Sequence, residues 1–100
     1  IAELDDEIIG TVAVRNSWSD APQITTPWIG GLFVRPVDRG QGVAMALVDA
    51  ACAHAFSEGH EAVHIAIRYG SENYETRGWK VVGTMMAGDE SVTVLRRDAI

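Results

Sequence analysis

Short apolar runs separated by turn-forming residues recur along the first third of the chain. The runs at residues 1–4 and 7–15 flank Asp5-Asp6 and predict two strands of a β-hairpin. A third run, residues 28–35, ends before a proline and predicts another strand. Its Gly30-Gly31 interruption is typical of a bulge or of a splayed position where a partner backbone approaches.

A polar stretch separates the second run from the third. Residues 16–27 are rich in Asn, Ser, Asp, Pro, Gln and Thr, which predicts a loop. Loops of this length in compact domains are often functional, so this segment is a candidate wall of a binding site.

After the loop that follows the third run, apolar residues recur about every 3.6 positions instead of every second position, which predicts an amphipathic helix. The residues that share its apolar face are Ala44, Leu47, Val48, Ala51, Cys52 and Ala55. Asp49 and His54 fall off this face, and Gly59 is placed to end the helix.

The second half of the chain predicts a further strand and a closing hairpin. Residues 62–68 have the composition of a central strand, and 71–78 predict a turn or a short helix. Residues 79–86 and 91–97 predict two strands joined around Gly88-Asp89. The order β-β-β-α-β-(α)-β-β indicates an α/β (α+β layered) domain in which a helix crosses over a mixed sheet.

Composition limits the classes of protein to consider. With 100 residues, 47% of them hydrophobic, and no long apolar run, the chain predicts one soluble domain without a membrane segment. A single cysteine, Cys52, cannot form an internal disulfide, which suits the cytoplasm, and its place in the helical pattern predicts a buried filler. The net charge of −6 and the single lysine, Lys80, argue against a nucleic-acid surface and favour a cationic ligand.

The stretch VRPVDRGQGVA, residues 34–44, has the features of an anion-binding loop. Backbone N–H groups at a helix start have no intrahelical partner, and the helix dipole adds positive potential there. Gly40 and Gly42 allow positive φ and close approach, while Arg39 can bond phosphate oxygens. No acidic residue follows until Asp49. By themselves these residues are equally compatible with a simple turn and a solvated arginine.

Two separated motifs resemble those of the GNAT family of N-acetyltransferases. LFVRPVDRGQGVAMALVDAA resembles the family's pyrophosphate loop, whose signature of Arg or Gln, two residues, Gly, one residue, and Gly or Ala is met by Arg39, Gly42 and Ala44. YETRGWKVVG resembles the family's Tyr-Glu-x-x-Gly-Phe/Trp segment at Tyr74 and Gly78-Trp79. One helix and one strand separate the two, as in the family. A dinucleotide loop fits less well, because Gly-x-Gly-x-x-Gly is not completed.

The resemblance implies a largely antiparallel mixed sheet with a splayed central strand pair, and acetyl-CoA as co-substrate. It places the pantetheine arm along Leu32, Phe33 and Val34. It assigns the pyrophosphate to the backbone amides of Arg39, Gly40, Gln41, Gly42, Val43 and Ala44. The implied reaction is direct attack of a primary amine of a small acceptor on the thioester, with Tyr74 donating a proton to the departing thiolate. The phenol could instead pack its ring under the sheet.

The base that would deprotonate the amine is less well defined. Many family members place a carboxylate on the strand before the loop, where this chain has Gly30-Gly31. Glu3 and Asp20 could act through water, or be ordinary solvated acids. His64 is predicted to face away from its apolar neighbours in the strand, as an exposed or hydrogen-bonded structural residue. The three histidines lack the spacing of metal ligands, so no metal is predicted.

Several features bear on the acceptor site. The family's N-terminal strand and helix pair are absent from these residues and the chain begins with Ile1, so we expect a domain over 1–100 that is N-terminally incomplete. The part of the acceptor site that this strand and helix pair forms in the family could come from an omitted segment or from a second subunit of a homodimer. Trp18 and Trp28 could line the site or act as core and surface anchors. Asn73 could touch the cofactor or cap a short helix. The alternative function is a catalytically silent acyl-CoA-binding module.

Overall fold

The computed structural model describes residues 2–4, 7–15, 27–40 and 42–99. The predicted Asp5-Asp6 turn, most of the 16–27 loop and Gln41 lie outside the described residues. The elements follow the predicted order: β1 (Ala2–Leu4), β2 (Glu7–Arg15), β3 (Trp28–Val34), a 3-10 turn (Pro36–Asp38), α1 (Val43–Ser57), β4 (Ala62–Ile67), α2 (Ser71–Glu75), β5 (Lys80–Ala87) and β6 (Glu90–Asp98).

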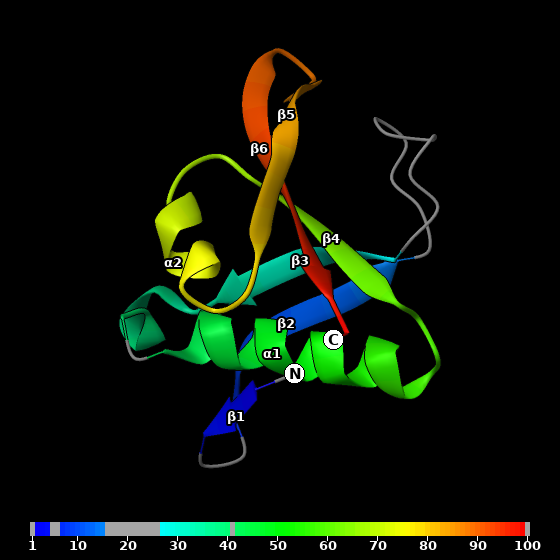
Figure 1. The fold of residues 1–100 in the computed structure, drawn as a ribbon. Coiled ribbons are helices and arrows are strands. Elements are labelled where there is room, and N and C mark those ends of the chain that lie inside the picture. The colour runs from blue at the N-terminus through cyan, green and yellow to red at the C-terminus, as the bar shows by residue number, and fades with distance from the viewer. Residues whose placement is uncertain (1, 5–6, 16–26, 41, 100) are drawn as a thin grey trace.

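The strands form one mixed sheet of order β1-β2-β3-β4-β6-β5, and α1 crosses one of its faces (Figure 1). Every neighbouring pair is antiparallel except β3 and β4. That pair is parallel because its connection runs through α1, which brings the chain back to the same end of the sheet. The predicted largely antiparallel sheet with a crossover helix is confirmed.

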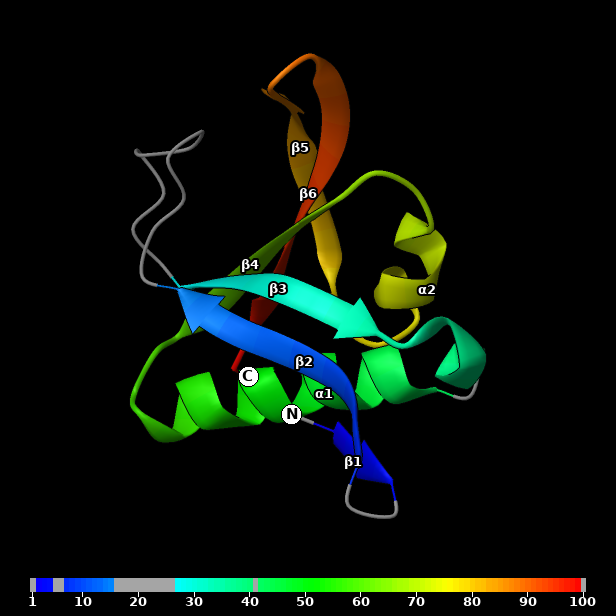
Figure 2. The same ribbon diagram turned by 180° about the vertical axis from the view of Figure 1, so that it is seen from behind.

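The central strands β3 and β4 pair over a very short distance. Their ladder consists of Trp28 opposite His64 and Ile29 opposite Ile65. Beyond this point the two strands spread apart toward α2, as seen from the back of the molecule (Figure 2). From Gly30 onward, the edge of β3 that faces β4 therefore has no strand partner among the described residues. The predicted splayed pair is present.

The glycine pair in β3 forms a bulge against β2. Thr11 lies opposite Phe33, but Ala13 lies opposite Gly30, so β3 contains one more residue than β2 over this interval. Gly31 has a φ of 62°, and its carbonyl accepts a hydrogen bond from Thr11 Oγ1 at 3.1 Å. Of the two predicted explanations for Gly30-Gly31, the bulge is confirmed.

The hydrophobic core lies between α1 and the sheet. The predicted face of α1 is buried, except that Ala44 is only half-buried. Val63 and Ile65 of β4 join this core together with Tyr74 and Trp79. Cys52 is buried here as predicted, and burial raises the pKa of its thiol above the ordinary value. The helix gives way to Gly59, which has a φ of 92° and is the predicted C-terminal stop.

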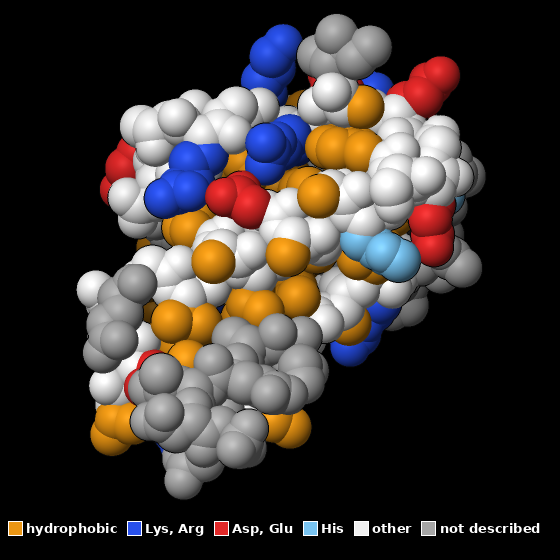
Figure 3. All heavy atoms as spheres, turned by 90° about the horizontal axis from the view of Figure 1, so that it is seen from below, with side chains coloured by type: hydrophobic (Ala, Val, Ile, Leu, Met, Phe, Trp, Pro, Cys, Tyr) orange, Lys and Arg blue, Asp and Glu red, His pale blue; other side chains and the backbone are white. Residues whose placement is uncertain are grey.

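The exposed side of α1 carries small hydrophobic side chains. Ala46, Ala50 and Ala53 are exposed on it, and the view from this side shows hydrophobic side chains spread among a few charges (Figure 3). Asp49 accepts hydrogen bonds from Arg77 at 3.2 Å and from Arg97 at 3.1 Å. None of the helices within the described ranges is long and apolar enough to span a membrane.

The opposite face of the sheet carries a second apolar cluster around Trp28 and Val94. His64 lies on this face, as the alternation of the strand predicts, and its ring centroid is 5.2 Å from that of Trp28. Its exposed fraction is only 5%, so the exposed alternative for His64 is wrong. Burial, reinforced by Arg96, lowers the pKa of His64 below its ordinary value.

Candidate functional site

Hydrogen bonds and an ion pair of Arg35 hold the loop after β3. The backbone N–H of Arg35 donates to the carbonyl of Ile9 at 2.7 Å, which ties the loop to β2. Its side-chain Nε pairs with the buried carboxylate of Asp38 at 2.6 Å, and the N–H of Asp38 donates to the Arg35 carbonyl. This turn fixes the direction in which the chain enters α1.

The start of α1 has open backbone donors. Gly42 is the N-cap residue, with a φ of 79°, and no side chain caps the helix. The first intrahelical bond runs from Ala46 N–H to the Gly42 carbonyl, which leaves the N–H groups of residues 43–45 without helical partners. No acidic side chain stands in this first turn. The helix dipole and these donors together favour an anion here.

The two loop glycines are required by backbone conformation. Gly40 and Gly42 both have φ near +80°, a region that residues with a side chain rarely occupy. A Cβ added at either position would meet no atom within 4 Å. Space around these positions is therefore open, as an approaching ligand would need.

Arg39 supplies a cation beside the helix start. Its Nε donates to the carbonyl of Val34 at 2.9 Å, and its guanidinium carbon lies 5.6 Å from the centroid of the Phe33 ring. No carboxylate pairs with it in the part of the chain that the structure describes. The guanidinium is held in place by a neutral partner and keeps its charge available.

A hollow of about 530 Å³ joins the end of β3 to this loop. All the residues that the sequence assigned to the cofactor line it, except Gln41, which lies outside the described residues. The lining residues are Leu32, Phe33, Val34, Asp38, Arg39, Gly40, Gly42, Val43, Ala44, Met45 and Tyr69. The structure thus brings the strand residues and the loop residues of the prediction into one concave surface.

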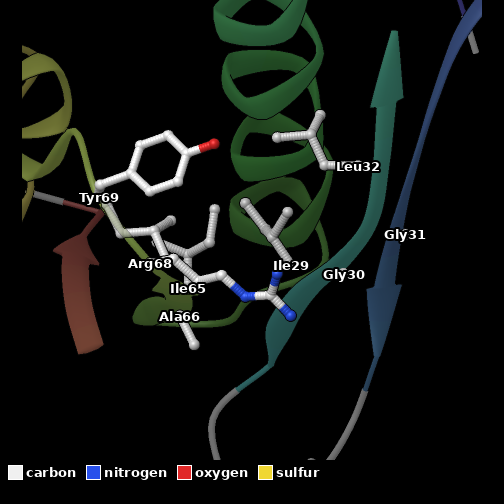
Figure 4. A pocket seen from close by; sticks show the side chains of 9 residues that line it. Ile29, Gly30, Gly31, Leu32, Ile65, Ala66, Arg68 and Tyr69 are labelled. Atoms are coloured by element: carbon white, nitrogen blue, oxygen red, sulfur yellow. The ribbon is translucent and has the colours of Figure 1, made fainter. Parts of the chain in front are cut away.

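A second hollow, of about 350 Å³, lies between the diverging strands (Figure 4). Leu32 and Tyr69 line both hollows, so the two meet at these side chains. Tyr69 follows β4 and is 88% exposed. The sequence analysis did not single out Tyr69 or its neighbour Arg68, because their position depends on where the β3–β4 ladder stops, and no local pattern encodes that.

Tyr74 lies in the core beneath α1. Its ring meets Trp79 edge to face, with centroids 6.0 Å apart and an interplanar angle of 82°. Burial raises the pKa of its phenol above the ordinary value, so the hydroxyl stays protonated at neutral pH. Tyr74 is not among the described residues that line either hollow.

The structure does not describe the side chains proposed for deprotonating the amine. The side chain of Glu3 and the whole of Asp20 lie outside the described residues. Asp38 is the only carboxylate among the described residues that line the two hollows, and it is paired with Arg35. His54 is exposed on α1 and lies 3.1 Å from Glu58.

Two smaller expectations are also settled. Asn73 lies within α2, whose N-cap is Gly70, so the prediction that Asn73 caps this helix is wrong. Trp28 belongs to the apolar cluster on the face away from α1 and does not line the hollows formed by described residues. No three His, Cys, Asp or Glu side chains of the described ranges gather closely enough to hold a metal ion.

Comparison with protein families gives a match over most of the chain. Residues 1–78 match the model of the acetyltransferase (GNAT) family. This range includes the loop into α1 and reaches Tyr74 and Gly78. A search of curated proteins finds no match.

Solved structures share the fold at low sequence identity. An aminoglycoside 6′-N-acetyltransferase complexed with coenzyme A has a TM-score of 0.79 at 16% identity, covering 99% of this chain and 71% of its own. A structure described as acetyltransferase has a TM-score of 0.83 at 16% identity, covering 100% and 69%. Ard1 from Thermoplasma volcanium has a TM-score of 0.75 at 16% identity, covering 96% and 66%. Another acetyltransferase structure, from Lactobacillus plantarum, is covered over only 61% of its length.

Proposed function

Because this chain belongs to the acetyltransferase (GNAT) family, we propose that it transfers an acetyl group from acetyl-CoA to a primary amine of a small acceptor. The observation that carries the proposal is the pair of joined hollows. One reaches the donor-rich start of α1, and the other opens between the diverging strands β3 and β4. A long ligand with an anionic end and a reactive end fits such a surface.

The residues present fit acetyl-CoA. Its pyrophosphate would be held by the N–H groups at the start of α1 and by Arg39. Asp38 is the only carboxylate among the described residues that line this hollow, and it pairs with Arg35. Its pantetheine arm would lie along residues 32–34, because the edge of β3 that faces β4 has no strand partner there and can pair with an extended amide chain.

The proposed reaction is direct acyl transfer. The free amine attacks the thioester carbonyl carbon, a C–N bond forms, and the C–S bond breaks as the thiolate leaves. Backbone N–H groups on the free edge of β3 would stabilise the negative charge that develops on the carbonyl oxygen. Holding the amine next to the thioester supplies much of the rate.

We propose that Tyr74 donates the proton that the departing thiolate takes up. The proton that the amine nitrogen loses as the amide forms passes to solvent, and the Tyr74 phenolate regains a proton from solvent. A phenol with a reference pKa of about 10 loses its proton to a thiolate, whose thiol has a pKa of about 8.5, at a cost of only about 2 kcal/mol. Burial, which raises the pKa of Tyr74, increases this cost but keeps the donor protonated. Tyr69 is a second phenol, and it lines both hollows, so the two residues have to be compared in the same assay.

The second candidate function is an acyl-CoA-binding module without catalytic activity, and the residues that line the second hollow favour keeping it. None of the described residues that line this hollow is a carboxylate or a histidine that could deprotonate the amine. A module that binds acyl-CoA without transfer would need the first hollow but not a base.

Two measurements on the full-length protein separate these candidates. Acetyl-CoA is expected to raise the melting temperature, and Arg39→Gln is expected to weaken binding of acetyl-CoA but not of acetyl-pantetheine, which lacks the pyrophosphate. Thiol release with a panel of primary amines then tests transfer. Saturable release supports the enzyme, whereas acetyl-CoA binding without release from any amine supports the silent module.

A further inference from the structure

Arg15 lies over the glycine bulge of β3. It is the last residue of β2 and stands opposite Trp28 in the β2–β3 ladder. A Cβ added to Gly30 would lie 3.2 Å from Nε of Arg15, and one added to Gly31 would lie 3.7 Å from its Nη2. A side chain at Gly30 would therefore make the Arg15 guanidinium shift by a few tenths of an ångström, whereas a Cβ at Gly31 would only contact it. The glycine pair thus leaves room for the guanidinium of Arg15 beside the bulge.

Arg68 approaches the same bulge from the other strand. It follows β4 directly and lines the second hollow. Its guanidinium extends toward Gly30 in the close view (Figure 4). Its Nε pairs with Glu90 at 2.6 Å, and the side chain is 69% exposed, so its terminal nitrogens remain in contact with solvent.

The pleat of the sheet places the two arginines on one face. Arg68 pairs with Glu90 of β6, and because side chains alternate along that strand Glu90 shares a face with Val94, which packs with Trp28 away from α1. Arg15, which stands opposite Trp28, is on that face too. Arg15 thus lies over Gly30, which lines the second hollow, and Arg68 lines that hollow itself, so both guanidinium groups lie near Gly30.

Two arginines lie near the opening between β3 and β4, and the charge of one of them, Arg68, is shared with Glu90. Arg15 has no carboxylate partner among the described residues, and no acidic side chain lines the second hollow in that part of the chain. Guanidinium groups bind carboxylates through paired, charge-assisted hydrogen bonds, which are stronger and more directional than those of neutral donors. Two guanidinium groups near Gly30 are suited to bind one carboxylate between them.

We propose that the acceptor of this enzyme is a small amine that also carries a carboxylate, and that Arg15 and Arg68 hold this carboxylate at the opening between β3 and β4. The inference rests on the proposed acetyl transfer and names its substrate class. It reverses the expectation from the net charge of −6, which favoured a cationic acceptor. Surface charges more than about 8 Å away are screened at physiological salt, whereas the two arginines would contact the acceptor directly.

The test compares amino acids with their amides as acceptors of the full-length protein. Glycine is compared with glycinamide and phenylalanine with phenylalaninamide, because the members of each pair differ only in having a carboxylate or an amide. Rates are expressed per concentration of unprotonated amine, because the amines of the acids and the amides are protonated to different extents. The wild type is expected to favour the acids by about tenfold or more in kcat/KM. Arg15→Gln and Arg68→Gln are each expected to remove most of this preference without changing the KM for acetyl-CoA.

Control variants separate recognition from folding and from local charge balance. Arg77→Gln removes an exposed arginine that pairs with Asp49 outside both hollows, and it is expected to keep the preference. The double variant Arg68→Gln with Glu90→Gln avoids an unpaired Glu90 and is expected to behave like Arg68→Gln. Melting temperatures measured with acetyl-CoA check that each variant is folded.

Each result decides the inference. Amides used as well as the acids, or a preference that survives in both arginine variants, would overturn it while leaving acetyl transfer intact. Binding of acetyl-CoA without transfer to any amine would overturn both proposals. A preference for the acids that is lost in the Arg15 and Arg68 variants and kept in Arg77→Gln supports it.

Discussion

The ring of Tyr74 meets the ring of Trp79 edge to face, with centroids 6.0 Å apart, inside the core that α1 covers. The family motif therefore has a packing role as well as a proposed chemical one. These two roles depend on different parts of the side chain, the ring and the hydroxyl, so substitutions can separate them.

Tyr74→Phe is expected to lower kcat by about 100-fold, because it removes the proposed proton donor. It keeps the ring, and no hydrogen bond of the hydroxyl is present among the described residues, so the free energy of unfolding should change by less than about 1 kcal/mol. Thiol release and chemical denaturation give the two quantities. Tyr69→Phe is the matched control, and a larger loss in that variant would move the proton donor to Tyr69.

Ala44→Asp is expected to weaken acetyl-CoA binding and to stabilise the free protein. An acidic residue in the first turn of α1 interacts favourably with the helix dipole, by about 0.3–1 kcal/mol, but repels a pyrophosphate at the same place. Ala44→Asn has nearly the same shape without the charge. Titration calorimetry should show a Kd at least about tenfold weaker for Asp than for Asn. Equal affinities would argue against a pyrophosphate at this helix start.

Gly10→Ala is expected to destabilise the protein by about 1–3 kcal/mol. A Cβ at Gly10 would lie 2.9 Å from the backbone oxygen of Phe33 and 3.0 Å from Leu47 Cδ1, so the strand or the helix must shift. Gly83→Ala is the control, because a Cβ there meets nothing within 4 Å, and its effect should stay within about 0.5 kcal/mol. Urea denaturation of both variants measures the difference, and equal stabilities would contradict the close approach of β2 to β3 and α1.

Acidification is expected to destabilise the protein through His64. Burial, with a contribution from Arg96 that Asp98 partly offsets, makes the folded-state pKa lower than the unfolded value of about 6.5. The unfolded chain therefore binds the proton first. The stability that a neutral His64 supports is present above about pH 6.5 and is lost as the pH falls toward the folded pKa, with a slope of at most about 1.4 kcal/mol per pH unit.

The measurement is the free energy of unfolding between pH 7.5 and 5, determined for the wild type and for His64→Gln. The variant is expected to be less stable at pH 7.5, because the contact with Trp28 is altered. Its stability should nevertheless change less over this interval. Parallel curves for the two proteins would show that His64 does not titrate differently on folding.

The sequence by itself determined the elements and the loop proposed to bind the cofactor. Alternating and helical periods are local, so they predicted the strands, the face of α1 and its end at Gly59. The loop into α1 could also be predicted, because a helix start offers its N–H groups wherever the helix lies, and Gly42 and Arg39 are adjacent to it in sequence.

Only the tertiary structure decided which residues surround the place proposed for the thioester of acetyl-CoA. The burial of His64 and Trp28 depends on packing between strands that are distant in sequence. The second hollow exists because the β3–β4 ladder stops after two residue pairs. Arg15 lies over the bulge because β2 pairs with β3, whereas Arg68, 53 positions later in the printed sequence, lines the hollow left by the short β3–β4 ladder. A hydrophobic period or a motif relates residues that are close in sequence. The arginines near the second hollow come from different strands, so their proximity is decided only when the sheet is assembled.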